Sequence, residues 1–404
     1  MSAVNNINSI VEKIAKNIPL AEYDVEYGEG NEKGEGYMGE MAFVKITPKG
    51  SGKTYNVAIK RAFTNQSIRE EVPIRDVFLN EVFFYKECFP VLQQLQSELD
   101  LPKFNNAPKC FYTSTEPENE YLAMENLKTS GFELFPKEKI IPYDHFEVLF
   151  KIYANLHATS VVLRKTQPEK FEKLASNFKE VATQFFDNPG NNNLWNAFFK
   201  QTGNKLIPGQ DDKTINAFEK KYSNNGVFHF MDSWGYHGQD PVINHGDCWS
   251  NNVMLKYNKQ KELVDLKVLD WQLLKLGSPV HDLSYCLYSG GSKDTFDRLD
   301  ELLQVYYMSF SDVLKIAGLN FEEVYPYSLL EKEWKEYGKY GWLMSLIVIK
   351  VKLTNPEDKV DLMDLCNSDD REIIAKKKLE GTPSEAYDRR IRELLLHVHE
   401  IGAL

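Results

Sequence analysis

Three short polar side chains in the middle of the chain have the types and spacing that phosphoryl transfer requires. Asp247 follows an apolar run in VINHGD, Asn252 comes shortly after it, and Asp270 ends a further apolar run, VLD. One aspartate can orient the proton of an attacking hydroxyl, while an asparagine and a second aspartate hold Mg²⁺ against nucleotide phosphates. The pattern therefore predicts a catalytic loop over residues 243–254 and a metal-binding strand over residues 266–272.

The segments around these residues indicate how they are held. The apolar runs are typical of short buried strands, and we expect Asp247, Asn252 and Asp270 to lie at the ends of strands that form one hairpin. A carboxylate directly after a buried strand is costly unless it is paired or bound to a metal, which favours Asp270 as a Mg²⁺ ligand over a strand cap. We expect His245 to brace the loop by hydrogen bonds, and Asp282 either to cap a helix or to hydrogen-bond the loop.

A second group of candidates lies far upstream, among strand-like segments. Lys60 lies in the string NVAIKR, on the same face of the predicted strand as Ala58. Kinases use a lysine at such a position to bind the α- and β-phosphates and pair it with a helix glutamate. Glu81, in the helical string NEVFFYKE, is the expected partner, and Glu70 and Glu71 are the alternatives.

A glycine-rich string precedes this strand. Gly34, Gly36 and Gly39 form the pattern GxGxxG, and their place ahead of Lys60 suits a loop that covers nucleotide phosphates. A lone GxGxxG is a weak signal, and the acidic residues within this one would repel phosphates unless they point outward. The string nevertheless predicts a nucleotide-binding loop.

The division of the chain follows from its length and from a change in pattern. At 404 residues it exceeds one average domain. The string MENL ends the last strand-like segment of the N-terminal part and leads into a polar loop, which we interpret as a hinge over residues 125–128. Helical spacing dominates after it. We therefore expect a bilobal α+β fold, with a small β-rich N-lobe over residues 1–124 and a larger, mainly helical C-lobe over residues 129–404.

Composition limits the partners. The net charge of −11 argues against a general nucleic-acid binder, because phosphate contacts need clustered Lys and Arg. There is no signal-peptide pattern and no apolar stretch long enough to span a bilayer. The five cysteines are scattered without a CxxC pair, which fits free thiols in a reducing compartment. We expect a cytoplasmic protein with no membrane contact and no obligate protein partner.

Two features have a functional and a structural interpretation. Cys248, next to the predicted base, is either a nucleophile or, as we expect, a small buried hydrophobe. An aromatic stripe, Trp334, Tyr337, Tyr340 and Trp342, is typical of a helix core. The same stripe is the alternative source of a pocket for a ring system, or of an aromatic cage for a cationic acceptor.

The string HGDCWSNNVMLKY, followed by VLDWQLLKLGSPVHDLSYCLYS, resembles the ecdysteroid kinase-like family of insects and other arthropods. That family is similar to choline kinases and aminoglycoside phosphotransferases, and more distantly to protein kinases. The resemblance implies a protein-kinase-like fold, ATP with Mg²⁺, and phosphorylation of a hydroxyl on a small molecule. Carried over by position, Asp247 is the catalytic base, Asn252 and Asp270 bind Mg²⁺, and Lys60 with Glu81 holds the phosphates.

The resemblance also suggests an acceptor and a nucleotide contact. The leading acceptor is an ecdysteroid or related steroid alcohol, and the alternatives are a choline- or ethanolamine-type substrate or a xenobiotic. A non-catalytic small-molecule binder on a kinase-like fold is a further alternative. The chain has Trp271 where the family usually has Phe after the metal-binding aspartate. The residues that would contact adenine, mostly through backbone groups, are Met124, Glu125, Asn126 and Leu127.

Overall fold

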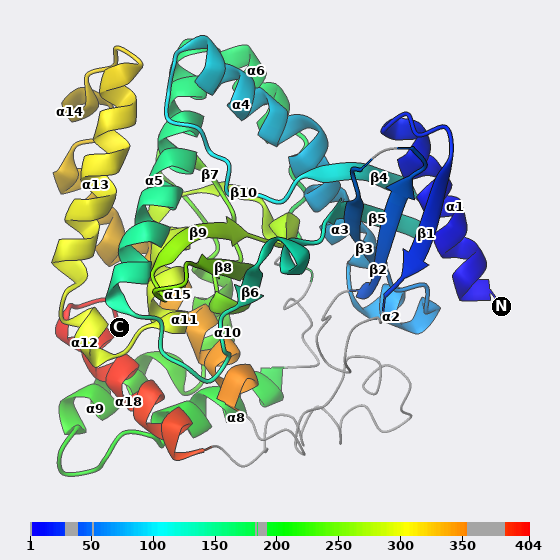
Figure 1. Ribbon diagram of the computed structural model, residues 1–404. Coiled ribbons are helices and arrows are strands. Elements are labelled where there is room, and N and C mark those ends of the chain that lie inside the picture. Colours follow the sequence, from blue (N-terminus) through cyan, green and yellow to red (C-terminus); the bar gives the residue numbers. More distant parts are fainter. Residues whose placement is uncertain (1, 29–38, 51, 182–183, 185–191, 354–383) are drawn as a thin grey trace.

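The computed structural model has a bilobal α+β fold, as the sequence predicts (Figure 1). It describes residues 2–28, 39–50, 52–181, 184, 192–353 and 384–404. A small lobe built on an antiparallel sheet lies at one side of the molecule, and a larger lobe made mostly of helices lies at the other. Among the described residues, no helix combines the length and apolar character needed to cross a membrane.

The small lobe contains a five-stranded sheet with the strand order β1-β2-β3-β5-β4, in which every neighbouring pair is antiparallel. The sequence did not predict β1, because its string YDVEY is short and polar and lies at the edge of the sheet with side chains that are partly or fully exposed. The strands are β1 (Tyr23–Tyr27), β2 (Gly39–Pro48), β3 (Tyr55–Ala62), β4 (Cys110–Glu116) and β5 (Asn119–Glu125).

The two faces of this sheet have different tasks. The amphipathic helix α1 (Ser2–Asn17) covers one face, where its apolar side chains pack against Val57 and Ile59 of β3. Because side chains alternate along a strand, Ala58 and Lys60 point to the opposite face and line the cavity between the lobes. This is the predicted alternation. Lys60 is thereby presented to helix α3 (Ile74–Phe83) rather than to solvent.

The helix of the small lobe is longer than predicted. The sequence indicated a helix that ends at Cys88, but α3 continues through a π-helical turn, Phe84–Cys88, into α4 (Phe89–Glu98). Such turns insert an extra residue and re-aim the side chains beside them. Here Phe84 stacks on Trp271 with 3.7 Å between ring centroids and 4° between planes. The short helix α2 (Gln66–Glu71) precedes this unit.

Long helices form the core of the large lobe. Gly341 in α15 lets that helix approach α11 closely, because a Cβ atom there would lie 2.2 Å from Ser284. The helices are α5 (Tyr143–Thr166), α6 (Pro168–Ala175), α8 (Asn192–Gly203), α9 (Asp212–Tyr222), α10 (Gly226–Asp232), α11 (Pro279–Gly290), α12 (Lys293–Phe296), α13 (Leu299–Ile316), α14 (Phe321–Val324), α15 (Tyr327–Leu353) and α18 (Glu385–Glu400).

Two small sheets carry the predicted catalytic strings, and here one expectation is wrong. The hairpin of β8 (Val253–Tyr257) and β9 (Leu263–Val268) has Asn252 before its first strand and Asp270 after its second. Asp247 does not belong to this hairpin. It follows β7 (Val242–Asn244), which pairs instead with β10 (Lys275–Gly277), and the third strand of the hairpin sheet is β6 (Phe132–Leu134). Strands of three residues leave too short a pattern to show their partners.

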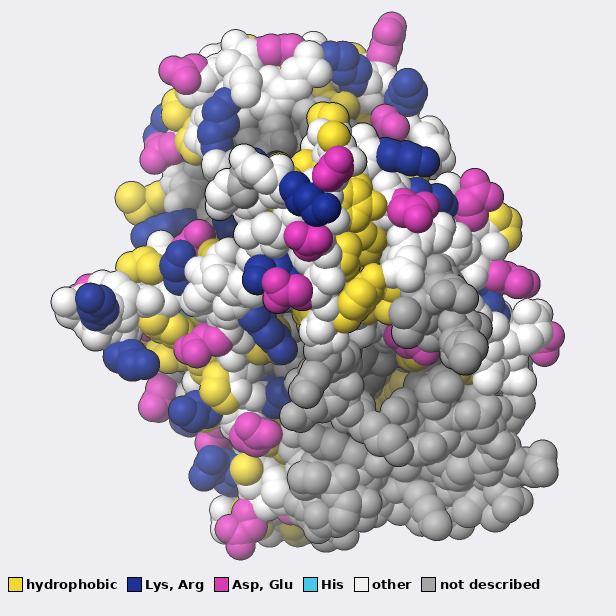
Figure 2. Space-filling model, turned by 45° about the vertical axis from the view of Figure 1, so that its right-hand side comes forward, with side chains coloured by type: hydrophobic (Ala, Val, Ile, Leu, Met, Phe, Trp, Pro, Cys, Tyr) yellow, Lys and Arg dark blue, Asp and Glu magenta, His cyan; other side chains and the backbone are white. Residues whose placement is uncertain are grey.

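Charged side chains are mixed over the surface. On the described part of the face in Figure 2, Lys and Arg alternate with Asp and Glu. A nucleic-acid-binding surface would instead gather Lys and Arg on one face or stripe. This face therefore has no large basic patch among the residues described, in keeping with the negative net charge.

Candidate active site

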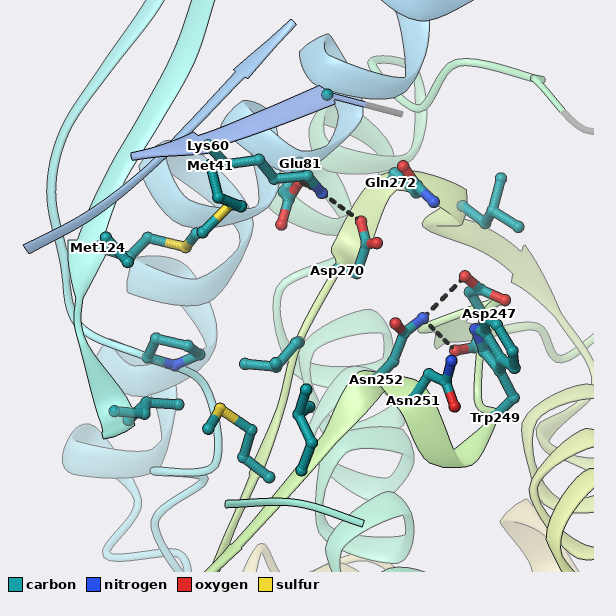
Figure 3. A pocket seen from close by; sticks show the side chains of 18 of the residues that line it. Met41, Lys60, Glu81, Met124, Asp247, Trp249, Asn251, Asn252, Asp270 and Gln272 are labelled. Atoms are coloured by element: carbon teal, nitrogen blue, oxygen red, sulfur yellow. Dashed lines mark hydrogen bonds and ion pairs between the residues drawn. The ribbon is translucent and has the colours of Figure 1, made fainter. Parts of the chain in front are cut away.

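A cavity of about 430 Å³ lies between the lobes and collects most of the predicted site residues (Figure 3). Gly39 is the member of the predicted glycine loop that the structure describes, whereas Gly34 and Gly36 lie outside the described residues. The predicted residues that line the cavity are Gly39, Lys60, Glu81, Met124, Glu125, Asn126, Leu127, Asp247, Asn252 and Asp270.

Lys60 is the centre of a buried group of charges at one end of the cavity. Its Nζ lies 2.7 Å from Oε2 of Glu81 and 2.5 Å from Oδ1 of Asp270. The predicted Lys60–Glu81 ion pair is therefore confirmed. Burial alone would lower the pKa of Lys60, but the charges of Asp270 and Glu81 outweigh it and raise that pKa above its ordinary value. The ammonium thus stays charged and linked to both lobes.

Asp270 is held by an unusual backbone conformation. Its φ of 67° lies in the left-handed region, which aspartate tolerates better than most residues. The turn aims its carboxylate at Lys60, while the next side chain, Trp271, is fully buried between Phe84 and His245. Trp271 thus joins the helix unit of Glu81 to the loop of His245 by aromatic contacts.

Asp247 is fixed by neutral donors. Nδ2 of Asn252 donates to its Oδ2 at 2.8 Å and to its carbonyl oxygen at 2.9 Å, and the hydroxyl of Tyr285 donates to Oδ1 at 3.2 Å. Burial, reinforced by the negative charge of Asp270, raises the pKa of Asp247 to about 7. A carboxyl group whose pKa lies near 7 can exchange a proton with a bound hydroxyl at physiological pH.

Asp282 organises the backbone of this loop. Its two oxygens accept the backbone N–H groups of His245 at 2.7 Å and Gly246 at 2.9 Å, and Oδ2 also contacts Nε2 of His157 at 3.1 Å. Burial acts to raise the pKa of Asp282, but these hydrogen bonds, that of His157 foremost, hold it well below its usual value. Of the two roles expected for Asp282, the structure shows the bond to the loop.

His245 and Gly246 shape the turn before the base. His245 is fully buried, and its Nε2 contacts the carbonyl oxygen of Leu269 at 2.8 Å, which ties the loop to the strand that precedes Asp270. Gly246 has a φ of 84°, and a Cβ atom there would lie 2.1 Å from the carbonyl oxygen of Leu273. The bracing role predicted for His245 is confirmed, and the turn requires glycine.

The family follows from this sequence pattern and its extent. The model of the ecdysteroid kinase-like family matches residues 33–319, which is most of the chain. The chain belongs to this family. The match includes the strand of Lys60, the helix of Glu81, and the segments predicted as catalytic loop and metal-binding strand. A comparison with curated proteins found no match.

Three solved structures are similar to this ecdysteroid kinase-like chain. An ethanolamine kinase of Plasmodium vivax has 14% identity and a TM-score of 0.40, covering 89% of this chain and 80% of its own. A choline kinase of Cryptosporidium parvum has 11% identity and a TM-score of 0.38, covering 85% and 96%. The GDP complex of aminoglycoside 2′-phosphotransferase-IIIa has 15% identity and a TM-score of 0.35, covering 84% and 96%. The family assignment rests on the sequence match alone.

The residues present fit the magnesium ion that the family implies. Both hydrogen bonds that fix the Asn252 carboxamide use its nitrogen, and its oxygen points to the side where Asp270 lies (Figure 3). Mg²⁺ takes few protein oxygens and completes its shell with phosphate and water. Among the described residues no cluster of three or more His, Cys, Asp or Glu could hold a metal by itself. One carboxylate and one amide oxygen suit an ion that the nucleotide brings.

Residues of the predicted hinge line the same cavity. The backbone N–H of Asn126 donates to the carbonyl oxygen of Asn56 at 2.9 Å, and that of Glu125 donates to the carbonyl oxygen of Lys109 at 2.8 Å. These bonds hold the segment after β5 against the small lobe. Met124 and Leu127 add apolar side chains to the lining.

Several residues that support the site carried no local sequence signal. Tyr340 donates its hydroxyl to the carbonyl oxygen of Gly246 at 2.6 Å, and Nζ of the buried Lys352 donates to Oγ of Ser250 at 2.7 Å. Both donors belong to α15, and Tyr285 belongs to α11. The sequence analysis named only Tyr340 of these three, as part of the aromatic stripe, and no local pattern indicated its bond to the loop because all three act across long sequence separations.

The two features with open interpretations are structural. Cys248 is buried, and burial raises the pKa of its thiol well above the ordinary value, so it is a poor nucleophile. The aromatic stripe of α15 is also buried and lies outside the lining of the cavity, which excludes it as a direct wall of the pocket. Trp234 and Trp249 are the tryptophans that line the cavity.

Proposed function

We propose that this chain transfers the γ-phosphoryl group of ATP to a hydroxyl of a small molecule. The observation that carries the proposal is one cavity with two chemically different ends. Lys60, paired with Glu81 and Asp270, supplies a fixed positive charge for phosphates. For the acceptor, Asp247 supplies a carboxyl group whose pKa lies near 7. A non-catalytic binder would need neither the ion-paired lysine nor the buried base.

The roles of the residues follow from this arrangement. Lys60 holds the nucleotide phosphates, and Asp247 accepts a hydrogen bond from the acceptor hydroxyl and takes its proton as the bond to phosphorus forms. Mg²⁺, when bound through Asn252 and Asp270, neutralises charge on the phosphates. Asn252 has a second task, since its Nδ2 fixes the Asp247 carboxylate. Catalysis of this kind is mainly positioning and electrostatic stabilisation.

The proposal also covers the division of the chain and its surroundings. We assign residues 1–124 to the N-lobe, 125–128 to a hinge that contacts adenine through its backbone, and 129–404 to the C-lobe. The cavity residues Met124 to Leu127 support the hinge assignment. The cysteines that the structure describes are free thiols, which supports a cytoplasmic location.

The lining at the acceptor end favours a neutral, largely apolar alcohol. Met344, Val348 and Val351 recur at helical spacing along α15, and Trp234 and Trp249 also line the cavity. A steroid alcohol such as an ecdysteroid matches these walls, and an apolar xenobiotic alcohol would match them equally. A choline-type acceptor would need aromatic faces with a free carboxylate. The aromatic stripe of α15 does not reach the cavity.

A direct assay tests the proposal. The purified protein is incubated with Mg-ATP and a panel of ecdysteroids, apolar xenobiotic alcohols, amino alcohols and sugars, and products are followed by mass spectrometry. We expect a steroid or other apolar alcohol to gain the mass of one phosphate. Transfer to amino alcohols alone would refute the acceptor class, and transfer to no hydroxyl compound would support the non-catalytic alternative.

A further inference from the structure

A buried lysine lies behind the acceptor end of the cavity. Lys275 begins β10, and its side chain is 9% exposed. Its Nζ lies 4.1 Å from the ring centroid of Tyr340 and 5.0 Å from that of Trp234, and it donates to the carbonyl oxygen of Trp234 at 3.2 Å. The two rings meet nearly at right angles, with 86° between planes and 4.9 Å between centroids. We call Trp234 and Tyr340 the aromatic cage.

The cage has the composition that proteins use for alkylammonium ions. Two aromatic faces attract a cation through their quadrupoles, and a carbonyl oxygen adds a partial negative charge. Within the described chain no carboxylate lies within ion-pair distance of Lys275, and the acids that act on it do so at longer range. Even with its pKa lowered to about 8 by burial, Lys275 is mostly protonated at neutral pH. The cage therefore holds a cation of the chain itself.

The cage adjoins the active site. Trp234 is shared, because it lines the cavity and also faces the ammonium of Lys275. Tyr340 donates its hydroxyl to the carbonyl oxygen of Gly246, which directly precedes the proposed base, Asp247. An acceptor whose hydroxyl lies at Asp247 would therefore share Trp234 with the aromatic cage. That cage already contains the positive charge of Lys275.

Glu333, an acid of α15 directly before Trp334 of the aromatic stripe, cannot serve a cationic acceptor. Glu333 is 4% exposed, and its carboxylate accepts hydrogen bonds from Ser278 at 2.6 Å, Tyr325 at 2.7 Å and Tyr236 at 3.2 Å. It is also absent from the lining of the cavity as described. Among the described residues that line this end of the cavity, an incoming ammonium group therefore finds no carboxylate other than Asp247, and the aromatic cage beside it is already occupied.

We propose that Lys275 is a built-in cation that occupies the aromatic cage and thereby selects neutral hydroxyl acceptors over alkylammonium alcohols. The inference rests on the proposed function for its biological meaning, since it names the class of acceptor used at that site. Its physical content is independent of catalysis. Removing the ammonium should free the cage for a small external cation, and keeping a positive charge there should keep the cage closed.

The test is the binding of tetramethylammonium chloride to the full chain, measured by thermal shift and calorimetry. Lys275→Met should bind this cation at least about 10-fold more tightly than the wild type. tert-Butanol, a neutral molecule of similar shape, and sodium chloride should show no such difference. Lys275→Arg should resemble the wild type, because a guanidinium stacks on aromatic faces and keeps the charge.

A matched control separates the cage from lysine burial in general. Lys350 is another buried lysine, whose Nζ donates to Oε1 of Gln201 at 2.7 Å, and Lys350→Met should gain no affinity for tetramethylammonium. A folded Lys275→Met that gains no affinity would overturn the inference, as would equal gain in Lys350→Met. If Lys275→Met does not fold, the wild type and Lys275→Arg decide: binding by either overturns the inference, and exclusion by both supports it.

The same samples separate this inference from the proposed function. Cation binding needs no phosphoryl transfer, so a protein that phosphorylates nothing would still give a clear result with tetramethylammonium. If transfer to neutral alcohols is observed, Lys275→Met should also gain choline as a competitor of that acceptor. A wild type that phosphorylates choline as well as a neutral alcohol would overturn the role of Lys275 and leave the kinase activity standing.

Discussion

The two ends of the cavity differ in how they stabilise their charged side chains. At the nucleotide end, Lys60 is bound to Glu81 and Asp270, and its pKa is raised because the two carboxylates outweigh burial. At the acceptor end, no Lys or Arg of the described chain forms an ion pair with Asp247, whose bonds come from the neutral donors Asn252 and Tyr285. Lys60 at the nucleotide end therefore keeps its charge, whereas Asp247 at the acceptor end can exchange a proton.

The ends also differ in how they are built. At the nucleotide end, Lys60 and Glu81 come from a strand and a helix that are close in sequence, Asp270 comes from the large lobe, and their charged groups contact one another directly. The acceptor end comes from Trp234, after α10, and from the apolar side chains of Met344, Val348 and Val351 in α15. Phosphate binding is thus fixed by a few charged pairs, while acceptor choice is spread over many weak contacts. Substitutions at the two ends should therefore differ in size and in kind.

The largest effect is expected at Asp247. Asp247→Asn keeps the size of the side chain but removes the base, so kcat should fall about 10³-fold. Affinity for ATP should change little, because Lys60, Glu81 and Asp270 are untouched. Turnover and the thermal shift caused by Mg-ATP measure the two quantities. Asp265→Asn is the control, because Asp265 lies in β9 of the neighbouring hairpin and its side chain is 42% exposed. Wild-type turnover in Asp247→Asn would show that another group is the base.

The next effect is expected at the other end. Lys60→Met leaves two carboxylates facing each other without a cation, and should lower kcat/KM for ATP about 10²-fold and the free energy of unfolding by about 3 kcal/mol. Steady-state kinetics and urea unfolding measure these losses. Lys45→Met is the control, since Lys45 of β2 pairs with Glu26 of β1 and its side chain is 43% exposed. An unchanged KM for ATP would show that Lys60 does not bind the ATP phosphates.

The same contrast explains what the sequence could predict. Lys60, Glu81, Asn252 and Asp270 stand beside strong local patterns, a strand or an amphipathic helix, and the cavity brings all four together. The alternation along β3 was enough to aim Lys60. These predictions needed only local periodicity, because the burial of each element decides which way its side chains point.

The rest depended on contacts between distant segments. The placement of Asp247 outside the β8–β9 hairpin follows from the pairing of β7 with β10, and each of these strands has only three residues. Lys352 and Tyr340 reach the catalytic loop from α15, about a hundred residues downstream. No periodicity distinguishes a helix residue that braces a loop from one that packs in the core, so the acceptor end was not predicted in detail.

A smaller effect tests the environment of Asp247 through pH. The pKa of about 7 that Asp247 has in the folded protein exceeds its ordinary value of 3.8, so the folded protein binds this proton more tightly than the unfolded chain. The resulting stability is complete below pH 3.8 and is lost as the pH rises through 7. In metal-free buffer, the wild type should lose about 1 kcal/mol relative to Asp247→Asn between pH 6 and 8. Chemical unfolding of both proteins at both pH values measures this difference. If their free energies of unfolding changed equally with pH, the Asp247 carboxyl would lie in a more polar environment and its pKa would not be raised.

The smallest effect is expected on the apolar wall. Met344 lines the cavity from α15 and is 6% exposed, so Met344→Ala removes contact area for the acceptor without touching the nucleotide end. The KM for an apolar alcohol should rise about fivefold, because losing a few methylene-sized contacts costs roughly 1 kcal/mol, while the KM for ATP stays the same. Met308→Ala is the control, because Met308 lies on α13 and is 63% exposed. An equal rise in both KM values would mean that α15 acts on the whole cavity, and that the division into a charged end and an apolar end is too simple.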